Sequence, residues 1–183
     1  MAKSKSTTKN VTKKSKNAKP VKVAKKVARK PAVAPRPRAL TPYLAVNDAT
    51  RAIDWYKTVF GAKVEGDVQP GPGGMVMHAA LRIGDSQLFL SDIFPGSDLV
   101  DATRAGASVT MHYYRPNAGH VWERAVSNGA KVTMPFADQF WGDMYGKLLD
   151  PFGHSWSISC KSKLNKAQLE KLLVEAIKQM APQ

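Results

Sequence analysis

The chain has 183 residues, enough for one packed domain with appendages and too few for two domains with separate cores. Its net charge of +14 belongs to residues 1–38, which hold 14 of the 28 Lys and Arg residues and no Asp or Glu, while the other 14 basic and 14 acidic residues cancel. A single cysteine excludes an internal disulfide, and no apolar run is long enough for a membrane span or a secretory signal. We therefore expect a soluble protein in the cytoplasm.

Residues 1–38 are predicted to form a disordered, Lys-rich tail, because they contain no aromatic residue and their like charges repel. The run KPVKVAKKVARKPAVAPRPR resembles in composition the tails of linker histones and histone-like bacterial proteins. A string of cations releases counterions from a polyanion, so we expect salt-sensitive binding to DNA or another polyanion, and with it a nucleoid-associated location. The alternative is a solubilising or targeting extension without a partner.

Residues 39–92 predict a first module with one strand, one helix and three further strands. LTPYLAVN alternates as a strand does, Asp48 is placed to cap the helix that follows, and Gly61 to end it. Three strand-like runs come next, AKVEGDV, MVMHAALRI and SQLFLSD, with the turn-forming PGPGG before the second. The order is βαβββ.

Residues 107–160 repeat this order in a second module. ASVTMHYY reads as a strand, GHVWERAVSNG as a helix, AKVTMPF as a strand, and GDMYGKLLD and HSWSISC as two more strands. The tetrapeptide GAKV at residues 61–64 recurs at 129–132, at the same junction between helix and strand, which indicates an internal duplication. The fold class is therefore α+β, with one domain over residues 39–160 built from two βαβββ modules.

Residues 161–183 are predicted to hold a C-terminal amphipathic helix. Its apolar residues fall on one face, and Asn165 and Gln168 are placed as a capping pair. We expect this helix to dock onto its own domain, and pairing with another subunit is the alternative.

Paired modules of this order, with WYKTVFGA at the end of the first helix, resemble the vicinal-oxygen-chelate (VOC) superfamily of glyoxalases, ring-cleaving dioxygenases and bleomycin- or fosfomycin-resistance proteins. The runs TPYLAVNDATRAIDWY, MHAALRIGDSQLFLSD, GAKVTMP and DQFWGDMYGKLLDPFGHSWSIS are similar to the PhnB-like branch, although that branch usually carries Arg where this chain has Met144. The resemblance implies the glyoxalase/bleomycin resistance/dioxygenase fold over about 120 residues. It also implies a homodimer.

Metal-dependent members of this superfamily place two metal ligands in each module. The resemblance puts the four ligand positions at Thr41, Phe89, Thr110 and Ser157, and none of these is a usual ligand for Zn²⁺, Ni²⁺, Mn²⁺ or Fe²⁺. We therefore expect no metal and no cofactor. The alternative is that three of the histidines converge through the fold.

Side chains alternate along a strand, so Leu88, Leu90, Trp156 and Ile158 are expected to face the helices. Their neighbours in the sequence are then expected to line the opposite, concave face of the curved sheets, which we call the cup. Trp141 and Tyr145, expected in a loop, would either cover that cup as a lid or pack in the core. The candidate ligand-binding residues are those of the cup wall and this loop: Thr41, Tyr43, Phe89, Ser91, Thr110, His112, Tyr114, Trp141, Tyr145, Ser155 and Ser157. Hydroxyls and aromatic rings suit an uncharged or aromatic organic molecule.

The leading hypothesis is a metal-independent small-molecule-binding protein of the VOC superfamily that sequesters an organic ligand and is tethered to polyanions by its tail. A lyase or isomerase with His112 as catalytic base is one alternative, although a lone histidine is more often a hydrogen-bonded wall residue. A metal-dependent enzyme similar to glyoxalases or dioxygenases is another. In a further alternative the chain associates with nucleic acid mainly through its tail. The sequence does not name the ligand.

Overall fold

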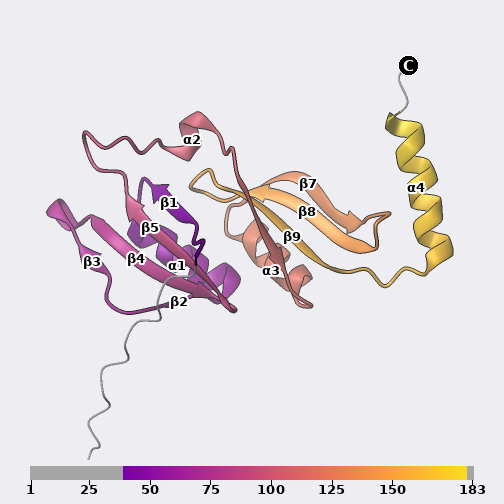
Figure 1. The fold of residues 1–183 in the computed structure, drawn as a ribbon, viewed down its shortest axis with the longest axis horizontal. Coiled ribbons are helices and arrows are strands. Elements are labelled where there is room, and N and C mark those ends of the chain that lie inside the picture. The colour runs from indigo at the N-terminus through magenta and orange to yellow at the C-terminus, as the bar shows by residue number, and fades with distance from the viewer. Residues whose placement is uncertain (1–38, 181–183) are drawn as a thin grey trace, which may run out of the picture. The chain divides into compact units, whose positions relative to one another are not determined.

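The computed structural model describes residues 39–180, so the predictions for the tail at 1–38 and for the last three residues lie outside the described residues. The first module follows the predicted order with one additional short strand, β3 (Figure 1): β1 (Tyr43–Val46), α1 (Ala49–Phe60), β2 (Lys63–Val64), β3 (Gln69–Pro70), the 3₁₀ turn η1 (Pro72–Gly74), β4 (Val76–Ile83) and β5 (Ser86–Asp92). The second module contains β6 (Thr110–Tyr114), α3 (Ala118–Ser127), β7 (Lys131–Asp138), β8 (Asp143–Leu149) and β9 (Ser155–Lys161). None of the helices in the described part of the chain has the length and apolar character that crossing a membrane requires.

The two modules form sheets of matching topology, which confirms the predicted α+β class. The first sheet has the order β1-β5-β4-β2, with β3 paired to β4, and the second has the order β6-β9-β8-β7. In each sheet the first strand of the module runs parallel to the last, and the remaining pairs are antiparallel. Helix α1 packs on the first sheet, α3 on the second, and the two helices contact each other.

Two features of the connections were not predicted. The strand expected over AKVEGDV is present only at β2, because Gly66 takes a left-handed backbone conformation with φ of 74°, and the next short strand, β3, comes after this run. The connection between the modules contains a four-residue helix, α2 (Ala102–Ala105), whose first turn is capped by the Asp101 carboxylate accepting from the backbone N–H of Thr103 at 2.9 Å.

The duplicated tetrapeptide has the same role in both modules. Gly61 and Gly129 follow α1 and α3 with φ of 65° and 86°, a conformation that glycine adopts without steric cost. The alanine after each glycine, Ala62 or Ala130, is buried. Each copy therefore ends a helix and turns the chain into the next strand.

The start of α1 is fixed by two carboxylates. Asp48 accepts from the backbone N–H of Arg51 at 3.0 Å, which confirms the predicted cap. Asp92, buried at the end of β5, accepts from the backbone N–H groups of Ala49 at 2.8 Å and Val76 at 2.7 Å. This second carboxylate joins the helix to both β4 and β5.

A buried carboxylate lies where the modules meet. Asp150 accepts four hydrogen bonds, from the Tyr56 hydroxyl at 2.7 Å, the Trp156 indole at 2.9 Å, and the backbone N–H groups of Phe152 at 3.0 Å and His154 at 2.9 Å. The Tyr56 ring also contacts the rings of Trp156 and Phe152. Because Tyr56 belongs to α1 and Asp150 follows β8, the two modules share this part of the core.

Side chains of each module also reach the helix end of the other. The Trp55 indole on α1 donates to the carbonyl of Asn128, which follows α3, at 2.9 Å. The Arg124 guanidinium on α3 donates to the carbonyl of Val59, near the end of α1, at 2.7 and 3.0 Å. The last carbonyls of a helix have no partner within it, so each module supplies a donor that the other needs.

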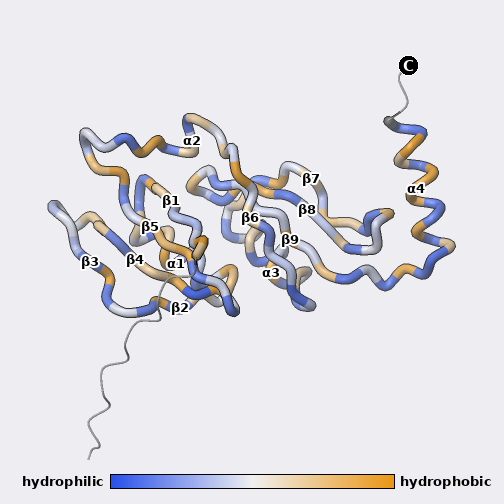
Figure 2. The backbone as a smooth tube through the Cα atoms, in the orientation of Figure 1, coloured by the Kyte–Doolittle hydropathy of each residue, from blue (hydrophilic) through white to orange (hydrophobic). Residues whose placement is uncertain are grey.

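The C-terminal helix α4 (Lys166–Met180) has the predicted cap. The backbone N–H of Asn165 donates to the Gln168 side chain at 2.9 Å, and the backbone N–H of Gln168 donates to the Asn165 side chain at 3.1 Å. Apolar and polar residues alternate along the helix (Figure 2), and Leu173 and Ile177 are 39% and 59% exposed. The described chain thus leaves much of its apolar face uncovered.

Candidate ligand-binding site

One face of the second sheet gathers six of the eleven candidate residues. The register pairs His112 with Ser157 across β6 and β9, and pairs Ser157 with Lys147 across β9 and β8. Residues paired in this way point to the same side of a sheet. We call this surface the second-sheet face, made of Thr110, His112, Tyr114, Tyr145, Lys147, Ser155, Ser157 and Ser159. The residues that alternate with these on β9, Trp156 and Ile158, are buried against the helix side as predicted.

Hydrogen bonds organise the second-sheet face. The imidazole Nδ1 of His112 lies 2.7 Å from the Ser157 hydroxyl oxygen, and the hydroxyls of Thr110 and Ser155 lie 3.0 Å apart. The three serines of β9 are buried, whereas the larger side chains of β6 and β8 stand on either side of them. The His112 ring stacks with that of Tyr145, at 6.1 Å between centroids and 25° between planes.

Two members of this face, Lys147 and Ser159, are not among the predicted residues, and Lys147 is the one that changes its chemistry. It lies on β8 between Tyr145 and Leu149, it is half-buried, and its register partner is Ser157. The signal was available, because strand parity that places Tyr145 on this face also places Lys147 there. The wall is therefore not made of hydroxyls and aromatic rings alone, since it also carries a cation.

The expected aromatic loop is shorter than predicted. Tyr145 lies within β8, which begins at Asp143, so the strand predicted over GDMYGKLLD is confirmed and the placement of Tyr145 in the loop was wrong. Trp141 is in the loop, half exposed, and its ring contacts that of Tyr145 at 5.7 Å. Gly146 points to the opposite side, where a Cβ atom would lie 2.7 Å from the Trp122 ring. A lid role for Trp141 stays a prediction.

The other candidate residues belong to the first sheet. Tyr43 on β1 is paired with Phe89 on β5, and their rings meet edge to face at 6.3 Å. His78 joins them, with its ring 4.9 Å from Phe89 and its Nδ1 3.5 Å from the Tyr43 hydroxyl. Ser91 is buried, and Thr41 precedes β1. The ring contacts of Tyr43 and Phe89 stay within this sheet, so the cup residues form two groups on two sheets.

The residues at the ligand positions do not fit the metal centre of metal-dependent members. Those positions carry hydroxyl and phenyl side chains, and no group of three or more His, Cys, Asp or Glu residues that could hold a metal ion occurs within residues 39–180. The histidines lie apart: His78 is beside Tyr43, His112 is bound to Ser157, and the Nε2 of His154 lies 3.2 Å from the carbonyl oxygen of Ala45.

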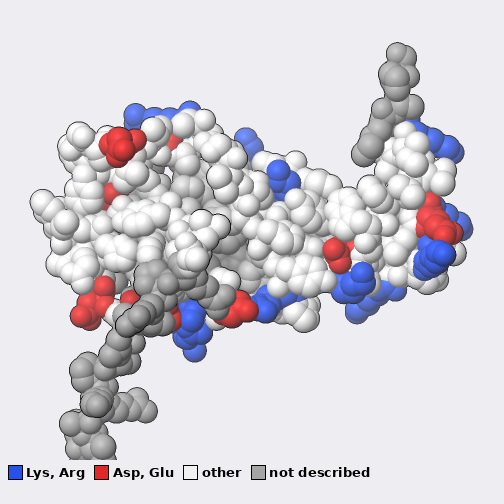
Figure 3. All heavy atoms as spheres, in the orientation of Figure 1, with Lys and Arg blue, Asp and Glu red and all other residues white. Residues whose placement is uncertain are grey.

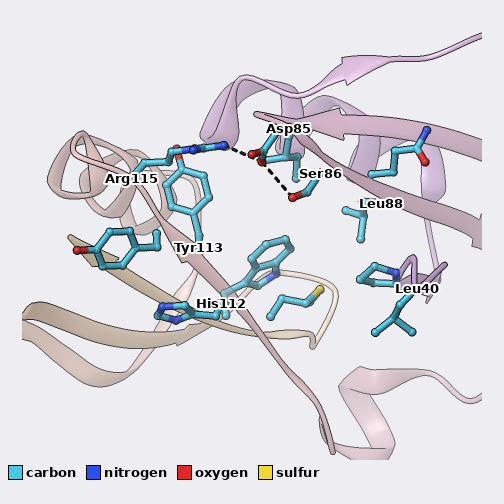
Figure 4. Close-up of a pocket in the computed structure, with 13 residues that line it drawn as sticks. Leu40, Asp85, Ser86, Leu88, His112, Tyr113 and Arg115 are labelled. Atoms are coloured by element: carbon cyan, nitrogen blue, oxygen red, sulfur yellow. Dashed lines mark hydrogen bonds and ion pairs between the residues drawn. The ribbon is translucent and has the colours of Figure 1, made fainter. Parts of the chain in front are cut away.

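A pocket of about 450 Å³ lies between the β4–β5 hairpin of the first module and β6 of the second (Figure 4). Most of its wall is apolar, and on one side the Arg115 guanidinium donates to the Asp85 carboxylate at 2.7 Å. The lining residues come from both modules: Leu40, Pro42, Ile83, Asp85, Ser86, Gln87, Leu88, Met111, His112, Tyr113, Tyr114, Arg115 and Trp156. The volume is in the range of ordinary small-molecule sites.

Among the candidate residues, His112 and Tyr114 line both this pocket and the second-sheet face. Sequence reasoning missed Met111, Asp85 and Arg115, because these residues meet only when the two modules pack together. The pKa of the Tyr114 phenol is raised, first by partial desolvation and then by the charge of Asp143, to which its hydroxyl donates at 3.4 Å. Tyr114 therefore stays protonated and remains a hydrogen-bond donor at neutral pH.

Two βαβββ modules, each with its first and last strands paired in parallel, define the class of fold to which the VOC proteins belong. Residues 38–158 match the family model of the Glyoxalase/Bleomycin resistance protein/Dioxygenase superfamily, and the chain therefore belongs to this superfamily. The match ends before α4 and begins where the basic tail ends.

Relatives of the chain cover the same domain. An uncharacterised protein of Mycobacterium bovis is 42% identical over 124 residues, which is 66% of this chain and 81% of the relative. The protein YjdN of Escherichia coli is 26% identical over 140 residues, 66% of this chain and 93% of its own length. The solved structure of a PhnB protein from Bacillus cereus is 15% identical with a TM-score of 0.56. The match covers 67% of this chain and 99% of that protein, and it shows that the fold is shared.

Proposed function

We propose that this chain binds a small organic molecule without a metal ion and sequesters it from solvent. The observation that carries the proposal is the chemistry of the four ligand positions, where Thr41, Phe89, Thr110 and Ser157 offer hydroxyls and a ring in place of imidazoles and carboxylates. The same sheets present the groups that usually hold an organic ligand, namely aromatic rings and a few placed hydrogen-bonding side chains.

The proposal includes a homodimer. Among the described residues β1 and β6 are edge strands of their sheets, and the exposed residues of these two strands are all candidates: Tyr43, Thr110, His112 and Tyr114. An edge strand offers unpaired backbone groups to another chain. A second copy that brings its first sheet to the second-sheet face of this one would join the two groups of candidate residues in one cup, and would shield a bound molecule.

Native mass spectrometry with elemental analysis tests this proposal directly. The full-length protein would be purified without metal affinity and exchanged into a volatile buffer. We expect a dimer with no stoichiometric metal, and a copurified organic mass that is lost on denaturation. One equivalent of a divalent metal per chain that survives dialysis would overturn the metal-independent function and favour an enzyme similar to glyoxalases or dioxygenases.

His112 supports a second candidate function, that of a lyase or isomerase. It is an exposed imidazole that lines the pocket, with one nitrogen held by Ser157 at 2.7 Å. Such a group could take a proton from a bound molecule. Once a ligand is known, His112→Ala separates the two functions: turnover lost with binding retained indicates an enzyme, and unchanged ligand chemistry indicates a binding protein.

The basic tail would tether the binding domain to nucleic acid or another polyanion, and so to the nucleoid in the cytoplasm. The tail carries 14 positive charges, whereas the net charge of residues 39–183 is zero. On the face shown in Figure 3, basic and acidic side chains of the domain are interspersed. Binding should be independent of sequence and fall steeply with salt. A full-length variant with the Lys and Arg of residues 1–38 replaced by Gln should leave heparin at much lower salt. Elution at the same salt as the unaltered protein would refute the tether.

A further inference from the structure

Lys147 occupies the middle of the second-sheet face. Its register partners are Ser157 on β9 and Met134 on β7, and Ser157 is in turn bound to His112 on β6. Directly paired residues of antiparallel strands have Cβ atoms about 5 Å apart, so the long Lys147 side chain can extend over the buried serines beside it. A half-buried lysine buries part of its stem and keeps its ammonium at the surface, where an acid of the protein or of a ligand can pair with it.

The carboxylates around Lys147 are engaged elsewhere. Asp143 is the nearest acid on the same face of β8, four residues and about 13 Å along the strand, and it accepts from Tyr114 at 3.4 Å and lies 3.9 Å from Lys161. Asp138 accepts from the Ser162 hydroxyl. Asp150 is buried on the other side of the sheet with four donors. Within residues 39–180, Lys147 has no ion pair.

The groups around Lys147 are donors. If the Ser157 hydroxyl donates to Nδ1 of His112, the imidazole keeps its Nε2–H, and if Nδ1–H donates to Ser157, the hydroxyl keeps its own hydrogen. The pair therefore leaves one N–H or O–H for a ligand in either neutral tautomer. The Tyr145 hydroxyl lies on the same face, and its stacked contact with His112 adds an aromatic surface. The centre of this face combines a positive charge, further donors and aromatic rings.

We propose that the second-sheet face recognises an anionic group, with Lys147 as the residue that selects for it. The ligand is then an organic anion, a carboxylate or a phosphate on an aromatic body, rather than the uncharged molecule that a wall of hydroxyls and rings suggests. This inference rests on the proposed function and names the class of its ligand. Charge-assisted hydrogen bonds are the stronger kind, so an anion should bind about tenfold or more tightly than its neutral isostere.

Benzoate and benzamide test this selectivity, because they share their shape and differ in charge, and phenyl phosphate distinguishes a phosphate from a carboxylate site. Each compound would be titrated into the full-length protein while the imidazole Cε1–H signal of His112, assigned from its loss in His112→Gln, is followed by NMR. We expect saturable shifts with benzoate or phenyl phosphate at concentrations at least about tenfold below those needed for benzamide.

Two substitutions complete the experiment. Lys147→Gln should abolish the preference for the anion, and Lys147→Arg should keep much of it. Lys63→Gln removes the same charge from the other module and should change nothing, and thermal unfolding would show that all variants are folded. Equal binding of benzoate and benzamide, or a preference that survives in Lys147→Gln, would overturn the inference and leave the proposed function standing. No shift with any of the three compounds would also overturn it, and the organic mass and metal content of the purified protein then decide the proposed function separately.

Discussion

Replacing Asp150 by Asn should destabilise the fold strongly, although the two side chains have the same size. One carboxylate oxygen accepts from the backbone N–H groups of Phe152 and His154, and the other from the Tyr56 hydroxyl and the Trp156 indole. An amide offers one accepting oxygen and one NH₂ group. If the amide oxygen in the Asp150→Asn variant pointed toward the backbone, its NH₂ group would face the indole N–H of Trp156. If the oxygen pointed toward the indole, the NH₂ group would face two backbone N–H groups. In both orientations a buried donor meets a donor.

The magnitude follows from the bonds that change. An unsatisfied buried donor costs about 1–3 kcal/mol, and the bonds that remain lose their charge assistance, so Asp150→Asn should lower the free energy of unfolding by about 2–4 kcal/mol. Tyr56→Phe is the matched control, because it removes one donor and leaves the carboxylate with three, and it should cost about 1–2 kcal/mol.

Urea unfolding of the full-length protein, followed by tryptophan fluorescence, measures both changes. The dependence of the free energy on urea should stay the same while the midpoint falls, since the folded surface does not change. The larger loss should also lower the melting temperature by about 3–5 °C for each kcal/mol. If Asp150→Asn costs no more than Tyr56→Phe, the four hydrogen bonds do not stabilise the junction between the modules as argued.

Three further outcomes follow from the structure. Burial first, and then the Asp150 carboxylate, hold the pKa of Tyr56 well above its ordinary value of 10.0, so above pH 10 the unfolded chain loses a proton that the folded chain keeps. The free energy of unfolding should then fall by about 1.4 kcal/mol per pH unit more steeply than in Tyr56→Phe, and parallel curves would contradict this. Gly153→Ala should lower the melting temperature more than Gly61→Ala, because a Cβ at Gly153 would lie 2.5 Å from backbone atoms, while a Cβ at Gly61 would meet open space. Gly61→Ala should cost only about 1–2 kcal/mol, from its left-handed backbone conformation. Equal losses in the two variants would refute this. Burial, and after it nearby carboxylates, raise the pKa of the Cys160 thiol above 9.0, so iodoacetamide should modify it more slowly at pH 7.5 than free cysteine, and an equal rate would show an accessible thiolate.

The fold could be predicted because the alternation along the strands, the helix caps and the repeated order of the elements all indicate the same architecture. Alternation along the strands placed Leu90 and Ile158 on the buried side, and both are fully buried. The caps at Asp48 and at Asn165 depend on residues close in sequence, so single residues were enough to find them. The break at Gly66 escaped, because the apolar and polar residues around it still alternate as in one strand.

The candidate site could be predicted only where strand parity decides it. Parity brought His112 and Ser157 to one face, and their hydrogen bond shows how close they lie. Lys147 obeys the same parity, but it is none of the hydroxyl, aromatic or metal-ligating side chains that the family resemblance indicates for the cup wall. The ion pair of Arg115 and Asp85 joins residues 30 positions apart in different modules, and no local pattern foretells how two modules pack.

The hydrogen bonds that each module donates to the helix end of the other have a consequence for the stability of either half alone. Arg124 completes the end of α1 and Trp55 completes the end of α3, so each half of the duplication carries a donor that fits the other half. A half expressed alone would expose the aromatic contacts around Tyr56 and leave a carbonyl without its donor. The halves therefore behave as complementary fragments: a chain cut between β5 and β6 should regain its structure when both pieces are mixed, and neither piece should fold by itself.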